Sequence, residues 1–170
     1  MARIGWTERK FEFNFPAGLY PEMIERLRGT PARIEDRVKG LPASILMRRD
    51  GERWSMQENI GHLLDLEELF SGRLDDYDRR LPVLRAADMS NEKTHRAEHN
   101  KQAIREILIA FRGARTDMVE RLENCEPLFF DRVAQHPRLN RPMRVVDLLY
   151  FQAEHDDYHL VRITELMQLL

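Results

Sequence analysis

Cysteine is almost absent from this sequence, which has a single one, Cys125, among 170 residues. A lone thiol cannot form an internal disulfide, and it cannot build a zinc cluster of cysteines. Cys125 follows Asn124 near the end of a helical pattern, and we do not expect it to act as a nucleophile. Any chemistry at a functional site must therefore come from other side chains.

Long apolar runs and a strong charge of one sign are also missing. No stretch approaches the roughly 18 consecutive apolar residues of a membrane span, and the opening residues, MARIGWTERK, contain no apolar signal region. The formal net charge is −2, which gives no support for nucleic-acid binding through a basic surface. We therefore expect a cytoplasmic protein with neither a nucleic-acid nor a membrane partner.

No repeat and no linker rich in proline, glycine or serine divides the chain. Hydrophobic residues make up 42% of it and charged residues 33%, which is typical of a globular protein rather than a disordered one. The chain is long enough to bury a substantial core. We expect one domain over residues 1–170, with its core at about 17–168.

Four stretches carry apolar residues at the three- and four-residue spacing of an amphipathic helix. They cover residues 19–41, 54–80, 104–122 and 144–169. Thr30 and Pro31 suit a helix start, so we expect the first helix to kink or restart there. Ser55 followed by Glu58 forms the capping-box pattern, which predicts the start of the second helix.

Strand patterns are nearly absent. Only FEFNF, residues 11–15, alternates apolar and polar residues, and it is too short to found a sheet. We interpret HPRLNRPMR, residues 136–144, as a loop. The sequence therefore predicts an all-α protein, most simply an antiparallel four-helix bundle. The FEFNF segment either covers the bundle or meets a second subunit in a homodimer, and both alternatives stay open.

Two histidines lie on the apolar face of the last predicted helix. His155 and His159 are four residues apart, so their rings lie on one side, one turn from each other. Alone, such a pair is most simply one exposed and one ordinary buried histidine. His62 changes this interpretation because it shares a face of the second helix with Leu66 and Leu69. Three facing imidazoles predict a divalent metal site with open positions for water or substrate.

Two better-known metal arrangements fit less well. In the zinc-protease pattern H-E-x-x-H the residue after the first histidine is glutamate, whereas here it is Asp156, and little chain follows His159 for a third ligand. A carboxylate-bridged di-iron bundle needs Glu-x-x-His on two helices. Glu92 and His95 match this pattern once, and Asp156 with His159 gives only a degraded second match.

A second histidine pair, His95 and His99, lies in a polar stretch before the third predicted helix. We interpret the pair as the solvated start of a helix. The alternative is that these side chains line the open end of the bundle near the metal.

The segments WSMQENIGHLLDLEELF and AEHDDYHLVRI resemble the two histidine motifs of the DinB-like superfamily, also described as YfiT-like metal-dependent hydrolases. Motif order and gaps agree over about residues 17–168. The resemblance implies an up-down-down-up four-helix bundle with short extra helices or loops. It also implies that His62, His155 and His159 are the metal ligands. Metals vary across the superfamily, and imidazole ligands favour zinc or nickel, with manganese and iron as alternatives.

Function follows less directly from the resemblance, because some members are hydrolases and others are transferases that use a low-molecular-weight thiol. We expect an ion that lowers the pKa of water or of a thiol and directs it at a small-molecule substrate. The alternatives are a non-catalytic metal-binding or stress-response protein, and a plain bundle that binds a partner. The candidates for orienting the imidazoles or meeting substrate are Glu58, Asp65, His99, Asp156 and Tyr158. Arg138, Arg141 and Arg144 are candidates for binding an anionic group.

Overall fold

Four long helices dominate the computed structural model, which describes residues 3–169. They are α1 (Tyr20–Val38), α3 (Met56–Asp78), α5 (Ile104–Glu123) and α6 (Val145–Met167). Two short helices, α2 (Ala43–Leu46) and α4 (Glu92–Ala97), lie in the connections, together with 3₁₀ turns at His99–Lys101 and Pro127–Asp131. Two further 3₁₀ turns, Trp6–Glu8 and Ala17–Leu19, precede α1. The four predicted helices are therefore confirmed.

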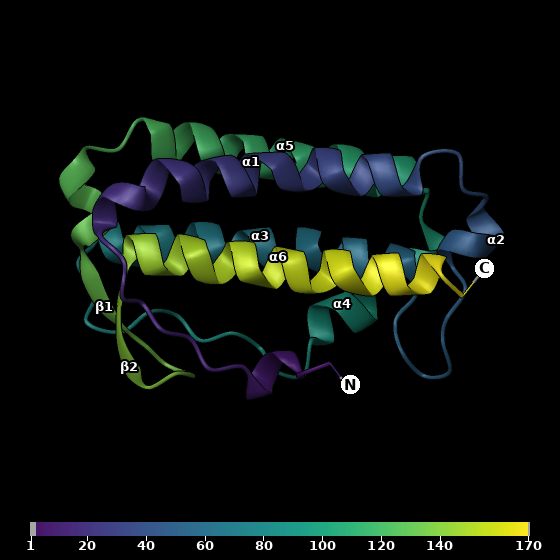
Figure 1. The fold of residues 1–170 in the computed structure, drawn as a ribbon, viewed down its shortest axis with the longest axis horizontal. Helices are drawn as coiled ribbons and strands as arrows, with labels where there is room; N and C mark the ends of the chain where they lie inside the picture. The colour runs from purple at the N-terminus through teal and green to yellow at the C-terminus, as the bar shows by residue number, and fades with distance from the viewer. Residues whose placement is uncertain (1–2, 170) are drawn as a thin grey trace.

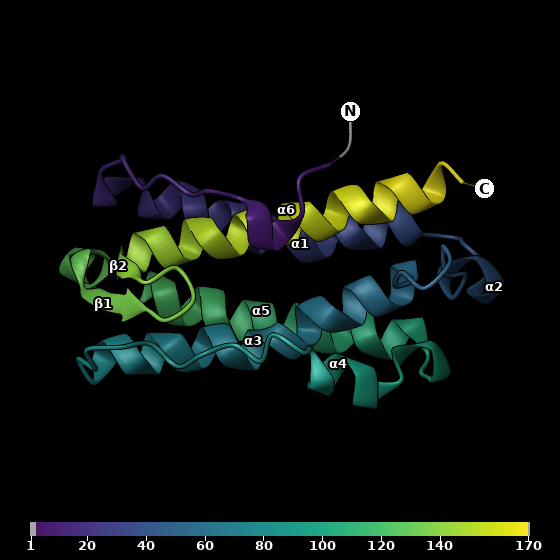
Figure 2. The same ribbon diagram turned by 90° about the horizontal axis from the view of Figure 1, so that it is seen from below.

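The long helices follow an up-down-down-up order. α1 and α6 run in one direction, whereas α3 and α5 run in the other (Figure 1). The long connection after α3 returns along the bundle, so that α5 begins at the end where α3 began (Figures 1 and 2). α1 packs against α5 and α6, and α3 packs against the same two helices. The topology implied by the family resemblance is confirmed.

The first helix is continuous across Thr30 and Pro31, so the predicted restart there is wrong. Pro31 lies inside α1, where its missing N–H leaves the carbonyl of Leu27 without its helical partner. Arg115 of α5 replaces that partner, because its Nη1 donates to the Leu27 carbonyl at 2.9 Å. A neighbouring helix thus stabilises a proline that an isolated helix would not tolerate.

The starts of α3 and α6 are fixed by carboxylates in their first turns. Ser55 Oγ accepts from the backbone N–H of Glu58 at 3.1 Å, and the Glu58 carboxylate accepts from the backbone N–H of Ser55 at 2.9 Å. The predicted capping box is confirmed. At α6, the carboxylate of Asp147 accepts from the backbone N–H of Arg144 at 2.8 Å, as the third-position acid of a capping box does, while the usual Ser or Thr before the helix is replaced by Arg144.

A small antiparallel hairpin replaces most of the loop predicted at residues 136–144. Its strands are β1 (Val133–His136) and β2 (Arg141–Arg144). Asn140 takes a left-handed conformation, with φ at 47°, which closes the turn between them. Each strand is too short for an alternating pattern to be recognised in the sequence. The hairpin matters for the site because it places the turn residues 137–140 beside α6.

The N-terminal segment lies along the bundle beside α6 (Figures 1 and 2). Phe11 is buried and packs edge-on against Phe151, with ring centroids 4.9 Å apart. Arg141 donates to the carbonyl of Phe11 at 2.8 Å, and Arg144 donates to that of Phe15 at 2.9 Å. The FEFNF stretch therefore covers the bundle, the first of its two open alternatives.

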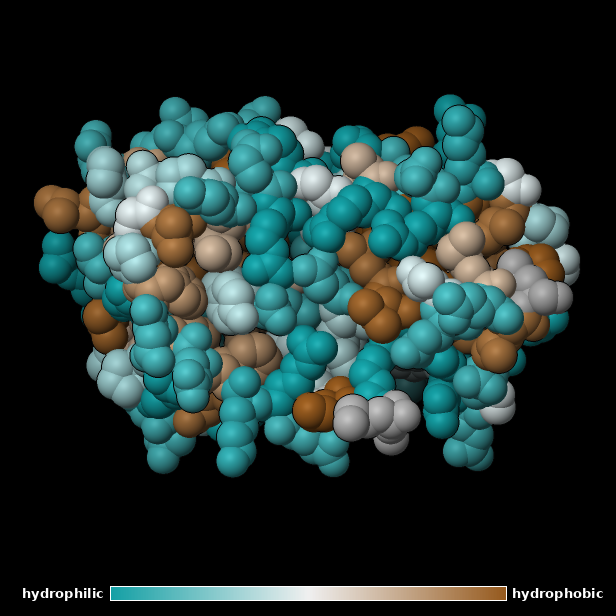
Figure 3. Space-filling view, viewed as in Figure 1, coloured by the Kyte–Doolittle hydropathy of each residue, from teal (hydrophilic) through white to brown (hydrophobic). Residues whose placement is uncertain are grey.

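Hydrophilic residues cover most of the face shown in Figure 3, with apolar side chains scattered between them. None of the helices between residues 3 and 169 combines the length and apolarity that crossing a bilayer requires.

Candidate metal centre

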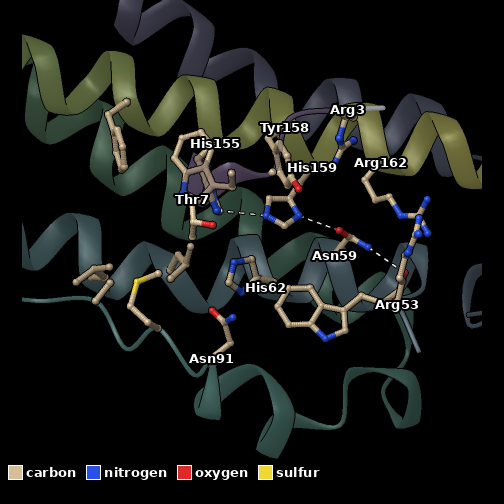
Figure 4. A pocket seen from close by; sticks show the side chains of 18 of the residues that line it. Arg3, Thr7, Arg53, Asn59, His62, Asn91, His155, Tyr158, His159 and Arg162 are labelled. Carbon is tan, nitrogen blue, oxygen red and sulfur yellow. Dashed lines mark hydrogen bonds between the residues drawn. The ribbon is translucent and has the colours of Figure 1, made fainter. Parts of the chain in front are cut away.

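Three histidines from two antiparallel helices meet inside the bundle. His155 and His159 project from α6 toward His62 of α3 (Figure 4). One ring nitrogen of each lies within 4.8 Å of those of the other two. All three side chains are buried, with exposed fractions between 4% and 6%. The helical stripes seen in the sequence thus bring these residues together.

Hydrogen bonding fixes the proton of His62 on Nδ1. This nitrogen lies 3.0 Å from Oγ1 of Thr94, and the same hydroxyl donates to Oδ2 of Asp65 at 2.8 Å. A hydroxyl has one proton to donate, so toward His62 it can only accept. His62 therefore carries its proton on Nδ1, and the lone pair of Nε2 is left for another partner.

Asn59 fixes the proton of His159 on Nδ1, as Thr94 does for His62. Its side-chain amide nitrogen donates to the backbone carbonyls of Ser55, at 2.7 Å, and Trp54, at 3.2 Å, so the amide oxygen faces the ring. That oxygen lies 2.8 Å from Nδ1 of His159. The imidazole donates from Nδ1, and its Nε2 carries the lone pair.

His155 completes the group. Its Nε2 lies 3.2 Å from Nε2 of His159. Two imidazole nitrogens bound to one tetrahedral ion at the usual 2.0–2.1 Å lie about 3.3 Å apart. The other nitrogen of His155, Nδ1, is buried without a hydrogen-bond partner among the described residues. The donor set and its spacing fit a divalent cation bound by neutral imidazoles.

The protonation states agree with this geometry. Burial lowers the pKa of His62 to about 4. Burial also lowers the pKa values of His155 and His159 well below the usual range, and the neighbouring histidines lower them further. All three rings are neutral near pH 7, which is the form that binds a metal ion.

The histidines face a pocket of about 1010 Å³ between α3, α6 and the N-terminal segment (Figure 4). Trp6 packs edge-on against His155, with ring centroids 4.8 Å apart, and Trp54 lies 4.7 Å from His62. A ligand in this pocket has direct access to the histidines. The arrangement resembles a catalytic metal site, which keeps positions open, more than a closed structural one.

Two of the proposed orienting residues lie around His62. Asp65 accepts from Thr94 as described, and it accepts from Nε2 of His99 at 2.9 Å. Gly61 makes this approach possible, because a Cβ at that position would lie 2.2 Å from the ring of His99. Tyr158 lines the pocket beside the N-terminal segment, where the guanidinium of Arg3 lies 4.0 Å from the centre of its ring.

The other two proposed orienting carboxylates lie elsewhere. Glu58 caps α3 and forms an ion pair with Arg49. Asp156 points away from the pocket toward α1 and α5, where Thr30 donates to it at 2.8 Å and Arg115 at 2.6 Å. Adjacent residues on a helix point about 100° apart, so Asp156 cannot share the face of His155.

The second histidine pair is split between two elements. His95 lies in α4 and is exposed, as expected for a solvated helix start. His99 follows a left-handed residue, Glu98, with φ at 47°, which turns it into the bundle and buries it. The two histidine pairs have the same spacing in the sequence, but only His155 and His159 lie on one face of a single helix.

Only one of the three candidate arginines reaches the pocket. Arg138 lines it, whereas Arg141 and Arg144 bind the N-terminal segment. Cys125 lies outside the pocket lining; its thiol donates to the carbonyl of Arg121 at 3.3 Å, and burial raises its pKa.

Sequence reasoning missed several residues around the pocket. Asn59 and Arg73 lie on the helical face of His62, three residues before it and eleven after it, and that spacing could have identified them. Thr94 and Trp6 come from connecting segments, and no local pattern predicts their position.

Comparisons with known proteins agree with the fold. A model of the DinB superfamily matches residues 26–162. YfiT from Bacillus subtilis, described as a probable metal-dependent hydrolase with an unusual four-helix bundle topology, is 21% identical, with a TM-score of 0.76 over 94% of this chain and 92% of that one.

Two further solved structures are similar at 10% identity, each with a TM-score of 0.70. A protein from Streptococcus pneumoniae aligns over 95% of this chain and 94% of its own. An uncharacterised protein from Clostridium difficile aligns over 95% and 99%. At these identities the likeness shows the fold alone. No curated protein matches the chain.

Proposed function

The chain belongs to the DinB superfamily, and from this premise we propose that it is a metal-dependent enzyme acting on a small molecule. It uses either water, as a hydrolase, or a low-molecular-weight thiol, as a transferase. His62, His155 and His159 are the proposed ligands. A bound divalent ion supplies Lewis acidity and lowers the pKa of a water or thiol ligand.

The observation that carries this proposal is the convergence of three neutral imidazoles on a large pocket. Asn59 and Thr94 hold two of the rings with Nδ1 as donor, so the Nε2 lone pairs are directed before any ion arrives. The pocket leaves room beside the histidines for a nucleophile and an electrophile. Zinc and nickel suit this sulfur-free ligand set best, and manganese or iron are the alternatives.

Around the three histidines, the protein's own residues orient the imidazole rings. No carboxylate among the described residues hydrogen-bonds to the three histidines; Asp65 acts on His62 through Thr94. The pocket lining contains no thiol, so a transferase reaction needs a thiol co-substrate. Trp6 packs against His155 and Trp54 against His62, so two indole rings flank the histidines.

Metal content tests the ligand assignment. We expect the purified protein, incubated with zinc or nickel and desalted, to retain about one equivalent, and the His62→Ala, His155→Ala and His159→Ala variants to retain almost none. His95→Ala is the matched control, because His95 is an exposed histidine of α4 beside Trp54. Equal metal content in the wild type and in a variant with all three histidines replaced by alanine would overturn the proposal.

Cobalt substitution separates an enzyme from a non-catalytic metal-binding protein. If coordination positions are open to the pocket, azide or a small thiol will change the visible spectrum of the cobalt-loaded protein. An unchanged spectrum would mean that the ion only links α3 to α6. Ester hydrolysis with and without added thiol then distinguishes water from thiol as the nucleophile.

A further inference from the structure

Beyond His155, the pocket ends in three basic side chains, Arg73, His136 and Arg138, which we call the basic end. Arg73 comes from α3, His136 from β1 and Arg138 from the hairpin turn. All three line the same pocket, and His136 and Arg138 both lie against Phe151, with 5.3 Å between the ring centroids and 5.4 Å from the guanidinium to the ring. Burial and the charges of both arginines lower the pKa of His136 to about 3. The fold thus gathers two cations from distant parts of the sequence in one wall of the pocket.

Arg73 has no acidic partner among residues 3–169. Its side chain is 2% exposed, and its Nε donates to the backbone carbonyl of Arg85 at 3.1 Å. The nearest acid, Asp76, is already bound by Arg85 through its backbone N–H and its guanidinium. No described carboxylate forms an ion pair with Arg73, so a buried cation remains uncompensated, which is unfavourable.

Arg138 and His136 also present unused donors. Nη2 of Arg138 is buried and has no hydrogen-bond partner among the described residues, and the same holds for Nε2 of His136. The Nδ1 of His136 accepts from the backbone N–H of Leu139 at 3.2 Å, so the neutral ring carries its proton on Nε2. The basic end therefore offers two buried N–H groups, Nη2 of Arg138 and Nε2 of His136, that have no acceptor among residues 3–169.

The basic end and the three histidines share a wall. Trp6 packs on His155, with ring centroids 4.8 Å apart, and its ring lies 5.8 Å from the guanidinium of Arg138. Along α3, the side chains between His62 and Arg73 that line the pocket are apolar: Leu66, Leu69 and Phe70. His62 and Arg73 are roughly 16 Å apart along the helix axis, and the arginine side chain leans back toward His62.

We propose that Arg73, Arg138 and His136 bind the carboxylate or phosphate of the substrate, a small anionic molecule whose apolar middle lies along Leu66 and Phe70. The anion accepts charge-assisted hydrogen bonds from the unused N–H groups, and arginine forms such bonds well with both carboxylates and phosphates. The other end of the molecule then lies at the histidines. This last point rests on the proposed function, whereas anion binding at the basic end does not.

Calorimetric titration of the metal-free protein tests the anion site. Hexanoate, hexyl phosphate and hexylammonium are matched probes that differ in charge and head group. We expect both anions to bind and hexylammonium not to bind, with Arg138→Gln weakening the anions about tenfold. Arg53→Gln is the control, because Arg53 lines the same pocket (Figure 4) but precedes α3, whereas Arg73 lies near the other end of that helix. It should leave the affinity unchanged.

Hexanoate that fails to bind, hexylammonium that binds equally well, or an equal loss in Arg53→Gln would overturn the anion site. The relative affinities of hexanoate and hexyl phosphate then indicate which anionic group the basic end prefers. Arg73→Met provides a second variant, in which we expect the same tenfold loss.

Cobalt-loaded protein tests whether an anion at the basic end directs the rest of the molecule to the histidines. We expect mercaptohexanoate to give a thiolate–cobalt absorption band at about tenfold lower concentration than mercaptohexylamine, an advantage that Arg138→Gln removes. Equal potency of the two thiols would overturn this link and leave the proposed function standing. A protein that binds no cobalt would overturn the proposed function, while hexanoate binding would still be measurable.

Discussion

Arg115 and Arg73 are both almost completely buried, at 1% and 2% exposure, but their surroundings are opposite. Arg115 lies between α5, α3 and α6 and is bound by two carboxylates, Glu67 and Asp156, each at 2.6 Å. Arg73 lies at the pocket, and no carboxylate in the described part of the chain pairs with it. One region satisfies its charges with protein groups, whereas the other leaves them for a molecule that is not part of the chain.

The pKa shifts express the same difference. Burial opposes the charged form of Arg115, but the charges of Asp156 and Glu67 outweigh it and raise its pKa above the usual value. Burial lowers the pKa of Arg73 to about 10, because the nearby acids compensate only weakly. Removing one member of the buried Arg115 cluster is strongly destabilising, because it leaves the remaining charges without a partner. The charge of Arg73 is not paired in this way and is available for binding a ligand.

The largest expected effect is on the closed cluster. Arg115→Met leaves Glu67 and Asp156 buried without a cation and should lower the free energy of unfolding by about 3–5 kcal/mol. Arg73→Met removes a cation with no acidic partner, so stability should stay within about 1 kcal/mol of the wild type. Urea denaturation measures both, and an equal loss in the two variants would contradict the comparison.

Metal binding at the three histidines should raise the free energy of unfolding by a smaller amount than Arg115→Met lowers it. At a free zinc or nickel concentration of one hundred times Kd, the free energy of unfolding should rise by about 2.7 kcal/mol. The His155→Ala variant should show no such increase, because the ion then loses one of three ligands. Thermal denaturation with and without metal measures this, and a similar increase in the variant would argue for a different site.

Two glycine-to-alanine substitutions distinguish the effect of close packing near His62 from the general preference of helices for alanine over glycine. Gly61→Ala places a methyl group against the ring of His99 and should destabilise the fold by about 1–3 kcal/mol. Gly113→Ala is the control in α5, where nothing lies within 4 Å of the new Cβ; it should stabilise by about 0.5–1 kcal/mol. Thermal denaturation of the two variants should therefore show shifts of opposite sign.

The smallest expected effect concerns the orientation of His62. Thr94→Val keeps the shape of the side chain but removes the hydroxyl that accepts from Nδ1. Metal affinity should fall about tenfold, the low end for losing a residue that orients a ligand. Thr94→Ser retains the hydroxyl and should bind nearly as tightly. Competition with a chromophoric chelator gives both constants, and equal affinities for the Val and Ser variants would remove Thr94 from the site.

The fold could be predicted where the signal is local. The four helices follow from apolar spacing, and the start of α3 follows from Ser55 and Glu58. The continuity of α1 through Pro31 could not, because it depends on Arg115, which is distant in the sequence. The hairpin strands were missed because each is only four residues long.

The candidate site divides in the same way. Periodicity placed the three histidines on inward faces, and the structure brings their rings together. Asp156 shows the limit of that reasoning, since proximity in sequence suggested an orienting role, whereas its side chain meets Arg115 on another face. The spacing of Asn59 from His62 indicates its face, but its bond to His159 depends on how α3 packs against α6. The contact of Thr94 with His62 depends on how α4 packs against α3, which no single helix pattern contains.

The chain has two tryptophans, Trp6 and Trp54, and each packs against a different histidine of the cluster. Intrinsic fluorescence thus becomes an optical probe of the site without any label. A paramagnetic ion such as nickel or cobalt, held between the two indoles, should quench their emission, whereas zinc, which has a filled d shell, should leave it bright. The colourless metal and the coloured ones can therefore be told apart in a cuvette.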